Sequence, residues 1–267
     1  MNHQITSLHN PRVKEAMRLR SSRGRKLQQR IILDGARELL RALEAGVDVR
    51  EIFVCPEWVQ MGDAMRALEI ARGREMAVLS VAPAVFGKLA YGSRTEGVLA
   101  LAQRPRSPWP DLPLPAVPLV VVLERVEKPG NLGGVLRTAD AAGAAAVLVA
   151  DPAVDPYNPN TIRASLGAVF STPVAVADGG AMLDWLRDRK LQILAARTDG
   201  KQLYTEVDFT RPSAIVLGSE AEGLSDLWNG DGVVSLKIPL RGHVDSLNVS
   251  VAAGVLMYEA LRQRNAS

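Results

Sequence analysis

The stretch Ile238-Pro-Leu-Arg-Gly-His-Val-Asp-Ser-Leu-Asn-Val-Ser-Val-Ala-Ala-Gly-Val-Leu-Met-Tyr-Glu259 predicts the end of a strand, a polar loop and then a helix. Ser246 or Asn248 can cap that helix, because either side-chain oxygen can accept a backbone N–H of the first turn. Small and β-branched residues fill the helix from Val249 to Val255. We expect this helix to be buried or pressed against a partner chain. An ordinary C-terminal core helix is the alternative.

Composition limits the class of protein. A chain of 267 residues predicts two domains or one large one, at roughly 100–200 residues per domain. Its hydrophobic content of 47% supports a packed core, and it has no apolar run long enough to span a bilayer and no signal-peptide pattern at its N-terminus. The single cysteine, Cys55, excludes an intrachain disulfide. The histidines lack ligand partners at metal-binding spacing. We expect a cytoplasmic protein without a metal.

Basic residues are concentrated near the N-terminus. Between positions 12 and 30 there are eight arginines and lysines and one acid, Glu15. Such a patch suits a polyanion, because each phosphate that it neutralises releases counterions. The alternative is a solvated helix face. The candidate contacts to nucleic acid are Arg12, Lys14, Arg23, Arg25 and Lys26.

The first hundred residues predict a small α/β domain. A helix at 10–22 and a basic turn at 23–26 precede strands at 31–35, 49–54, 76–79 and 97–102, which alternate with helices. Six prolines follow between positions 105 and 118, and they predict an extended linker because proline cannot donate a ladder hydrogen bond. The predicted organisation is a domain at 1–104, a linker at 105–118 and a second domain at 119–267.

The second domain predicts a parallel sheet. Leu119-Val-Val-Val-Leu123 is apolar throughout, as expected of a strand buried on both faces. Further strands are expected at 146–150, 173–176, 191–196, 214–218 and 234–238, with a helix at 161–169 among the connections. Ligands of such sheets bind at the carboxyl ends of the strands. Polar loops there are therefore the candidate site.

Two of these loops carry candidate functional residues. In the loop expected at 124–134, glycines let backbone amides approach a ligand, but their spacing is not that of a dinucleotide-binding fingerprint. Arg137, one turn into the next helix, can hold a phosphate with two hydrogen bonds, or it can form a surface ion pair. Glu220 follows a strand and Gly218 at the mouth of the sheet, whereas Glu222 can be an ordinary first-turn acid.

Three segments in order, Asn131–Gly143, Ile215–Leu224 and Ile238–Ser250, strongly resemble the three motifs of the SpoU/TrmH family. These proteins are RNA 2′-O-ribose methyltransferases of the SPOUT class. The resemblance covers positions 119–262. The N-terminal region is more loosely similar to the family's L7Ae-like substrate-binding domain, with Leu33-Asp-Gly where Val-Glu-Gly is common and Arg94-Thr-Glu-Gly97 where Pro-Gln-Gly is common.

The resemblance implies an α/β SPOUT domain with a parallel sheet and a deep trefoil knot, which general topology rules alone would not predict. It implies a homodimer through the knot region. It also implies that S-adenosylmethionine is the cofactor. The residues implied around the cofactor are Leu217, Gly218, Ile238, Ser246, Leu247 and Asn248.

By similarity, Arg137 lies at the ribose hydroxyl, and Asn131, Glu220, Ser246 and Asn248 complete the catalytic site. We interpret Arg137 as a phosphate clamp and a stabiliser of the developing alkoxide, since a guanidinium stays protonated. Asn160 and Arg163 are expected on the RNA side.

The expected function is S-adenosylmethionine-dependent methylation of a ribose 2′-hydroxyl. Ribosomal RNA is favoured, because the added domain resembles the ribosomal branch of the family. The alternatives are the same reaction on transfer RNA and a non-catalytic RNA-binding protein on the same scaffold. A nicotinamide-dependent enzyme is disfavoured by the spacing of the glycines.

Overall fold

The computed structural model describes residues 4–90 and 96–266, so the predicted motif residues Arg94 and Thr95 lie outside it. Contacts divide the chain into two compact units. The first comprises Met1–Arg106 and Tyr157–Ser171, and the second comprises Ser107–Pro156 and Thr172–Ser267. Within the described residues, no helix combines the length and the apolar character needed to cross a membrane.

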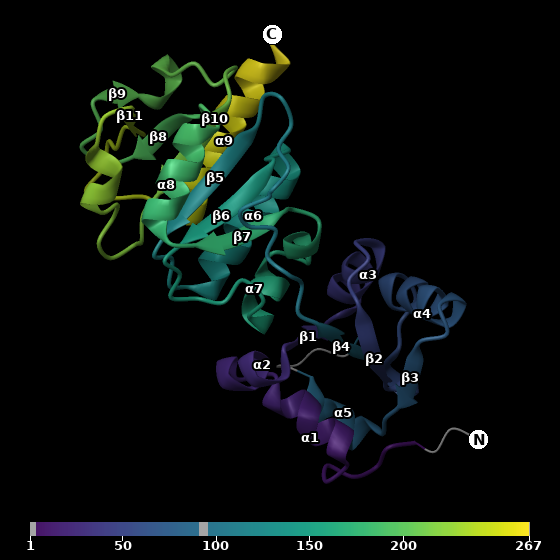
Figure 1. Ribbon diagram of the computed structural model, residues 1–267. Helices are drawn as coiled ribbons and strands as arrows, with labels where there is room; N and C mark the ends of the chain where they lie inside the picture. Colours follow the sequence, from purple (N-terminus) through teal and green to yellow (C-terminus); the bar gives the residue numbers. More distant parts are fainter. Residues whose placement is uncertain (1–3, 91–95, 267) are drawn as a thin grey trace. The chain divides into compact units, whose positions relative to one another are not determined.

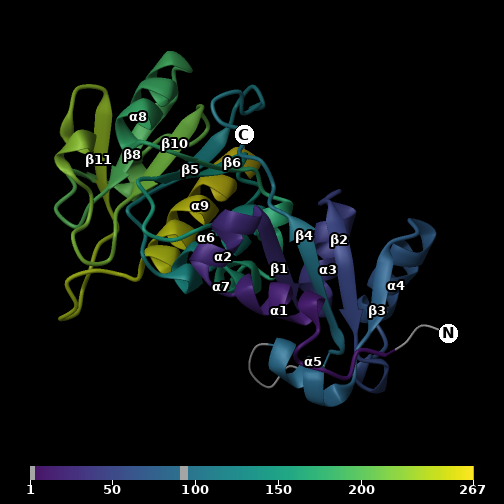
Figure 2. The same cartoon turned by 60° about the horizontal axis from the view of Figure 1, so that its bottom comes forward.

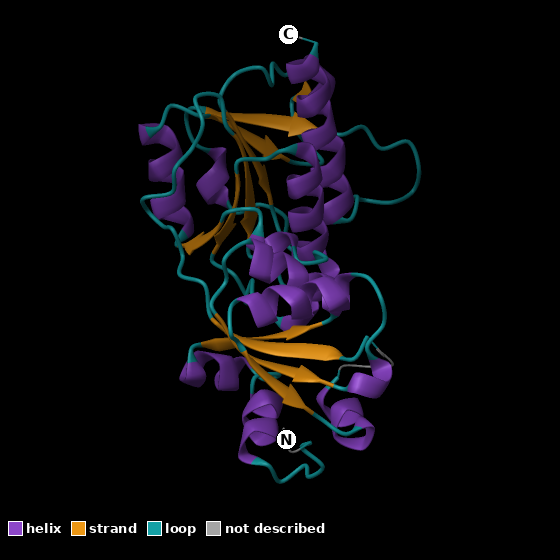
Figure 3. Cartoon of the chain, turned by 90° about the vertical axis from the view of Figure 1, so that its right-hand side faces the viewer, coloured by secondary structure: helices purple, strands orange, loops and turns teal. Residues whose placement is uncertain are grey.

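The first unit is built on a four-stranded mixed sheet with the order β1-β4-β2-β3 (Figure 1). Strands β1 and β2 run antiparallel to β4, and β3 runs parallel to β2. Helices α1 and α5 pack on one face of the sheet, and α3 and α4 cover the other (Figure 3). The elements are α1 (Pro11–Arg18), α2 (Ser22–Gln28), β1 (Arg30–Asp34), α3 (Ala36–Glu44), β2 (Val49–Val54), η1 (Pro56–Trp58), α4 (Asp63–Gly73), β3 (Ala77–Ser80), α5 (Pro83–Leu89) and β4 (Val98–Gln103).

The basic segment predicted as a turn is helix α2. The side chain of Ser21 caps it by accepting a hydrogen bond from the Gly24 amide at 3.0 Å. Arg25 on this helix is 1% exposed, and its guanidinium donates to the carbonyls of Leu19 at 3.2 Å and Arg20 at 3.1 Å. Arg25 therefore holds the end of α1 against α2, contrary to its sequence-based assignment as an RNA contact.

The segment Tyr157–Ser171 packs within the first unit, although the sequence places it in the second domain. It forms α7 (Pro159–Ala164) and η2 (Ala168–Phe170) in place of one helix over 161–169, and these elements contact β1 and α3. Gly167 has a φ of +83°, and a Cβ built there would lie 3.2 Å from the Cβ of Arg41. The turn that separates the two short helices thus needs both the left-handed conformation and the small side chain of glycine.

The second unit is built on a seven-stranded sheet with the order β7-β6-β5-β10-β8-β11-β9, in which every neighbouring pair is parallel. Helix α8 covers one face, and α6 and α9 cover the other (Figure 1). The elements are β5 (Leu119–Glu124), α6 (Pro129–Ala142), β6 (Ala146–Ala150), β7 (Val174–Ala177), α8 (Gly179–Asp188), β8 (Gln192–Ala196), β9 (Gln202–Leu203), η3 (Tyr204–Glu206), β10 (Ser213–Leu217), η4 (Asp226–Asn229), β11 (Val233–Lys237) and α9 (Val249–Asn265).

Helix α6 begins at Pro129, six residues before the predicted start at 135. Proline suits this first position because its missing N–H would have no partner inside the helix. The glycines that we interpreted as a ligand loop therefore lie inside the helix. A Cβ at Gly134 would lie 3.1 Å from the Cβ of Ser250 on α9, and one at Gly254 would lie 3.7 Å from the Cγ2 of Thr138. The small residues bring α6 and α9 side by side (Figure 2).

The middle of the proline-rich segment packs against α8. Trp109 contacts Trp185 with ring centroids 5.3 Å apart, and the Trp185 indole N–H donates to the carbonyl of Pro110 at 2.9 Å. The guanidinium of Arg189 lies over the Trp185 ring, 4.0 Å from its centroid, and Leu112 is buried. From Ser107 onward, the segment predicted as a linker is thus held on the second unit.

Candidate active site at the carboxyl ends of the parallel strands

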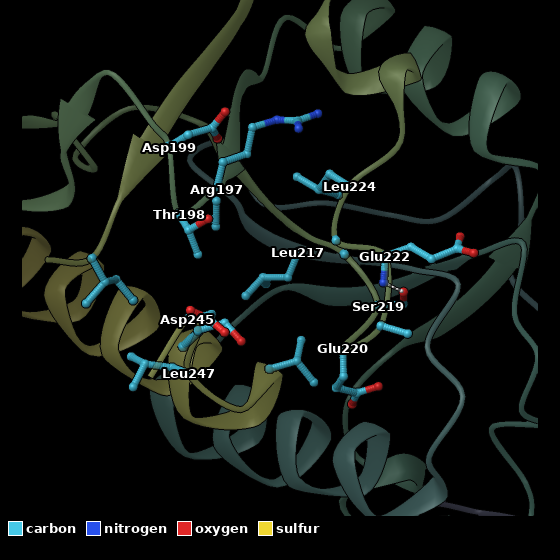
Figure 4. Close-up of a pocket in the computed structure, with 18 of the residues that line it drawn as sticks. Arg197, Thr198, Asp199, Leu217, Ser219, Glu220, Glu222, Leu224, Asp245 and Leu247 are labelled. Atoms are coloured by element: carbon cyan, nitrogen blue, oxygen red, sulfur yellow. Dashed lines mark hydrogen bonds between the residues drawn. The ribbon is translucent and has the colours of Figure 1, made fainter. Parts of the chain in front are cut away.

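A cavity of about 710 Å³ opens at the carboxyl ends of β8, β10 and β11 (Figure 4). Because the strands are parallel, the loops that follow them meet at one edge of the sheet. Its walls come from the segments after these strands and from the start of α9. They are Ala196–Asp199, Leu217–Leu224, Ile238 with Leu240, Asp245–Leu247, and Val249 with Ala252.

The loop after β10 folds tightly back on itself. Ser219 and Gly223 form an antiparallel bridge, and the Gly223 amide donates to the Ser219 carbonyl at 3.1 Å. The Ser219 hydroxyl, which is buried, accepts from the amide of Glu222 at 3.1 Å. A Cβ at Gly218 would lie 2.1 Å from the carbonyl carbon of Gly223, so only glycine fits. This closure fixes the direction of the neighbouring side chain, Glu220.

A buried carboxylate supports the far end of this loop. Glu124, at the end of β5, is 1% exposed and accepts hydrogen bonds from the Ser225 amide at 2.8 Å and hydroxyl at 2.6 Å. The guanidinium of Arg197, at the end of β8, donates to the Ser225 carbonyl at 2.9 Å. Charge-assisted hydrogen bonds of this kind are stronger than neutral ones, so the wall of the cavity is held by the ends of two strands.

Three polar side chains form a hydrogen-bonded series beside the cavity. The amide Nδ2 of Asn131, in the first turn of α6, donates to Oε1 of Glu220. The Oδ1 of Asn131 accepts from Nδ2 of Asn248 at 3.1 Å. Asn248 caps α9, because its Oδ1 accepts from the amide of Ser250 at 2.9 Å and from its hydroxyl at 2.6 Å. The side chains of Asn131 and Asn248 therefore each donate through Nδ2 and accept through Oδ1, which fixes the orientation of both amides.

The structure brings most of the predicted site residues together. The lining residues include Leu217, Gly218, Glu220, Ile238, Ser246 and Leu247, and the Glu220–Asn131–Asn248 hydrogen bonds lie at the edge of the cavity. Of the two predicted caps, Asn248 is the one used.

The residues that we predicted on the RNA side do not line this cavity. Arg137 is exposed on α6, and its guanidinium forms no hydrogen bond or ion pair with any other residue that the structure describes. Arg163 belongs to α7 in the first unit, as does Asn160.

One wall of the cavity was missed from the sequence. Arg197, Thr198 and Asp199 follow β8, and their loop contains no motif-like pattern. The signal that could have identified it is its position, because β8 is an apolar strand of a parallel sheet and the general rule for ligand sites applies to its carboxyl end as well. Asp245, in the loop before α9, also lines the cavity, although the sequence did not predict it as a site residue.

The chain matches two family models. Residues 118–258 match the SpoU rRNA Methylase family, and residues 10–100 match the MRM3-like substrate binding domain. A 23S rRNA (uridine(2479)-2′-O)-methyltransferase of Streptomyces viridochromogenes is 32% identical, and the alignment covers 98% of this chain and 92% of that protein.

Solved structures agree with these matches. The crystal structure of an RNA 2′-O ribose methyltransferase is 40% identical, with a TM-score of 0.86 over 98% of this chain and all of that one. An AdoMet-bound rRNA methyltransferase from Sinorhizobium meliloti is 29% identical, with a TM-score of 0.86 over 97% of both chains.

These matches extend over the sheet, the cavity and the N-terminal domain, and they confirm the resemblance seen in the three motifs. The chain therefore belongs to the SpoU rRNA methylase family, whose members are RNA 2′-O-ribose methyltransferases that use S-adenosylmethionine.

Proposed function

We propose that this protein transfers the methyl group of S-adenosylmethionine to the 2′-hydroxyl of one ribose in ribosomal RNA. The observation that carries the proposal is the Glu220–Asn131–Asn248 hydrogen-bonded series at the edge of the cavity. It joins one residue from each of the three family motifs into a single polar site. We also propose that residues 1–104 bind the RNA, that 119–267 form the methyltransferase domain with the family's trefoil knot, and that the protein acts in the cytoplasm.

The residues of the cavity fit the cofactor. Leu217, Ile238 and Leu247 offer apolar surface for the flat adenosine group. Gly218 leaves the loop backbone free of a side chain, so its peptide groups can approach a ligand closely. Carboxylates in the wall, among them Glu220 and Asp245, suit a cationic ligand. When bound, S-adenosylmethionine supplies an electrophilic methyl group, so the protein need not form a covalent intermediate.

The hydrogen-bonded series has a positioning role. Glu220 accepts from Asn131 and leaves its other carboxylate oxygen for a donor from the substrate side. Asn248 fixes Asn131 from the opposite end and Ser246 adds a hydroxyl to the wall. Holding two reactants in register can contribute roughly 7–11 kcal/mol to lowering the barrier. We assign these four residues to orienting the ribose.

Arg137 is suited to holding RNA. It is exposed on α6, the helix that carries Asn131, and no described side chain neutralises it. A guanidinium can donate two parallel hydrogen bonds to a phosphate and can stabilise the developing alkoxide. We keep Arg137 as phosphate clamp and alkoxide stabiliser on these grounds.

The reaction can be tested with purified protein. Incubation with S-adenosylmethionine and ribosomal RNA from a strain that lacks the gene is expected to give one new 2′-O-methylated nucleotide, mapped by nucleoside mass spectrometry. Transfer RNA is expected to stay unmodified. Arg137→Lys is expected to lower kcat/KM by roughly 10- to 100-fold, because an ammonium cannot form the two-pronged bond.

In that experiment Arg187→Lys, at an exposed position of α8, is the matched control and should retain wild-type kcat/KM. Methylation of transfer RNA alone would contradict the proposed substrate. Normal turnover by Arg137→Lys would contradict the clamp.

The two roles of Asn248 can be separated. Asn248→Asp keeps an acceptor for the Ser250 amide but loses the donor to Asn131, whereas Asn248→Ala loses both. Only the alanine variant is expected to lose stability, by about 1 kcal/mol in urea unfolding. Both variants are expected to lose turnover, because Asn131 is no longer fixed. Ser250→Ala, which leaves the bond to Asn131 intact, is the control, and wild-type turnover by Asn248→Asp would rule out the positioning role.

The proposed RNA surface lies on α1 and α2, where Arg12, Lys14, Arg23 and Lys26 are exposed. Arg12→Ala with Arg23→Ala is expected to reduce the slope of log K against log salt by about 0.7–0.9 per lost phosphate contact, measured by filter binding of ribosomal RNA fragments. The matched control is Arg66→Ala with Arg72→Ala on α4, where both arginines are also exposed. Equal slopes for the two double variants would exclude this surface.

We further propose a homodimer through the knot region. Val251 and Tyr258, seven residues apart on α9, share one stripe of the helix and are 52% and 51% exposed. Val244 and Leu247 in the preceding loop are also exposed. Such clustered apolar surface marks interaction sites.

Sedimentation velocity is expected to give the mass of two copies, and Val251→Glu with Tyr258→Glu should give one copy. Met61→Glu, at an 88% exposed residue of the first unit, should remain dimeric. A monomeric wild type would disprove the dimer.

A further inference from the structure

The charged side chains of the cavity wall are predominantly acidic. Four carboxylates line it, and the cationic side chain among its described lining residues is Arg197. The carboxylates come from three segments, so they do not face one side alone (Figure 4). They are Asp199 after β8, Glu220 and Glu222 after β10, and Asp245 before α9.

Two of these carboxylates already have partners. Glu220 accepts from Asn131, and Glu222 lies 3.6 Å from the guanidinium of Arg125. Arg197 donates to the Ser225 carbonyl, which ties it to the loop wall. Asp199 and Asp245, by contrast, form no hydrogen bond or ion pair with any residue that the structure describes. Their charges are therefore available to a ligand in the cavity.

We propose that Asp199 and Asp245 make the cavity select the cationic methyl donor over the neutral product, which rests on the proposed function. S-adenosylmethionine carries a positive sulfonium. S-adenosylhomocysteine has a neutral thioether at the same position and otherwise the same groups. The negative charges of Asp199 and Asp245 lower the energy of bound S-adenosylmethionine through its sulfonium. They leave the energy of bound S-adenosylhomocysteine almost unchanged, because its thioether is neutral. The two aspartates are thus specificity-determining residues for the cofactor.

Asp199 and Asp245 are both exposed in the isolated chain, and this exposure sets the size of the effect. Solvent and salt weaken the field of exposed charges, so the discrimination should shrink as ionic strength rises. The consequence for turnover is that S-adenosylmethionine can displace S-adenosylhomocysteine from the cavity, because the aspartates attract the sulfonium and not the neutral thioether. Residues that simply fill space would not distinguish the two ligands.

The test measures binding, not turnover. Isothermal titration of the full chain gives the Kd of S-adenosylmethionine, S-adenosylhomocysteine and sinefungin, in which an ammonium-bearing carbon replaces the sulfonium. In low salt, Asp199→Asn with Asp245→Asn is expected to raise the Kd of the two cationic ligands by roughly 5- to 20-fold and that of S-adenosylhomocysteine by less than about twofold. In roughly 0.5 M salt the difference between the ligands should largely disappear.

Asp231→Asn is the matched control, because Asp231 is an exposed aspartate of the same unit that does not line the cavity. It should leave all three dissociation constants unchanged. An equal rise for all three ligands with the double variant would show that the aspartates bind a group common to them, and no rise would show that they do not act on the ligand. Either result overturns the proposal.

Failure of the proposed function would look different. A wild-type chain that binds none of the three ligands would contradict the S-adenosylmethionine-dependent function itself. Wild-type binding of S-adenosylmethionine, with the same preference for donor over product in the double variant, would reject only the role of Asp199 and Asp245. Circular dichroism of each variant confirms that the compared chains are folded.

Discussion

The close contact of α6 with α9 is the constraint on which the site depends. Gly134 and Ser250 meet at this contact, and a Cβ at position 134 would lie 3.1 Å from the Cβ of Ser250, which is tighter than an ordinary contact. Asn131 lies one turn before Gly134, and Asn248 lies two residues before Ser250. The hydrogen bond between the two asparagines therefore exists because two backbones can approach so closely. Gly134 and Ser250, which resemble ordinary core residues in the sequence, thus determine the geometry of the polar site.

The loop after β10 supplies the third member of the series, and it is fixed by a separate set of contacts. Gly218 permits the sharp closure on Gly223, and buried Glu124 holds Ser225 at the other end. A buried carboxylate is costly unless it is hydrogen-bonded, so Glu124 strongly favours this loop conformation over alternatives. Glu220 is consequently held from the sheet side, and Asn131 meets it from the helix side.

The parallel sheet could be predicted, because its buried strands have an apolar pattern. Six of the cavity residues could be predicted as well, because the resemblance of three segments to the family motifs implied them. The start of α6 could not, since Gly133 and Gly134 resemble a loop until the partner helix α9 is known. The prediction that Arg25 contacts RNA was wrong for a similar reason. Its charge predicts a side chain that contacts solvent or RNA. Only the fold shows that its guanidinium donates to two backbone carbonyls. The packing of Tyr157–Ser171 on β1 and α3 depends on tertiary contacts that no local pattern records.

Arg137 is a predicted site residue that the fold of this chain leaves without a partner among the described residues. Its guanidinium is exposed and has no partner among the described residues, whereas Asn131, Glu220 and Asn248 are hydrogen-bonded to one another. An exposed guanidinium on the helix that carries Asn131 is free to pair with a phosphate. In the function that we propose, RNA phosphates would pair with that charge, and a second copy would cover the exposed stripe of α9. The features left unsatisfied in the isolated chain are thus the ones that substrate and partner would satisfy.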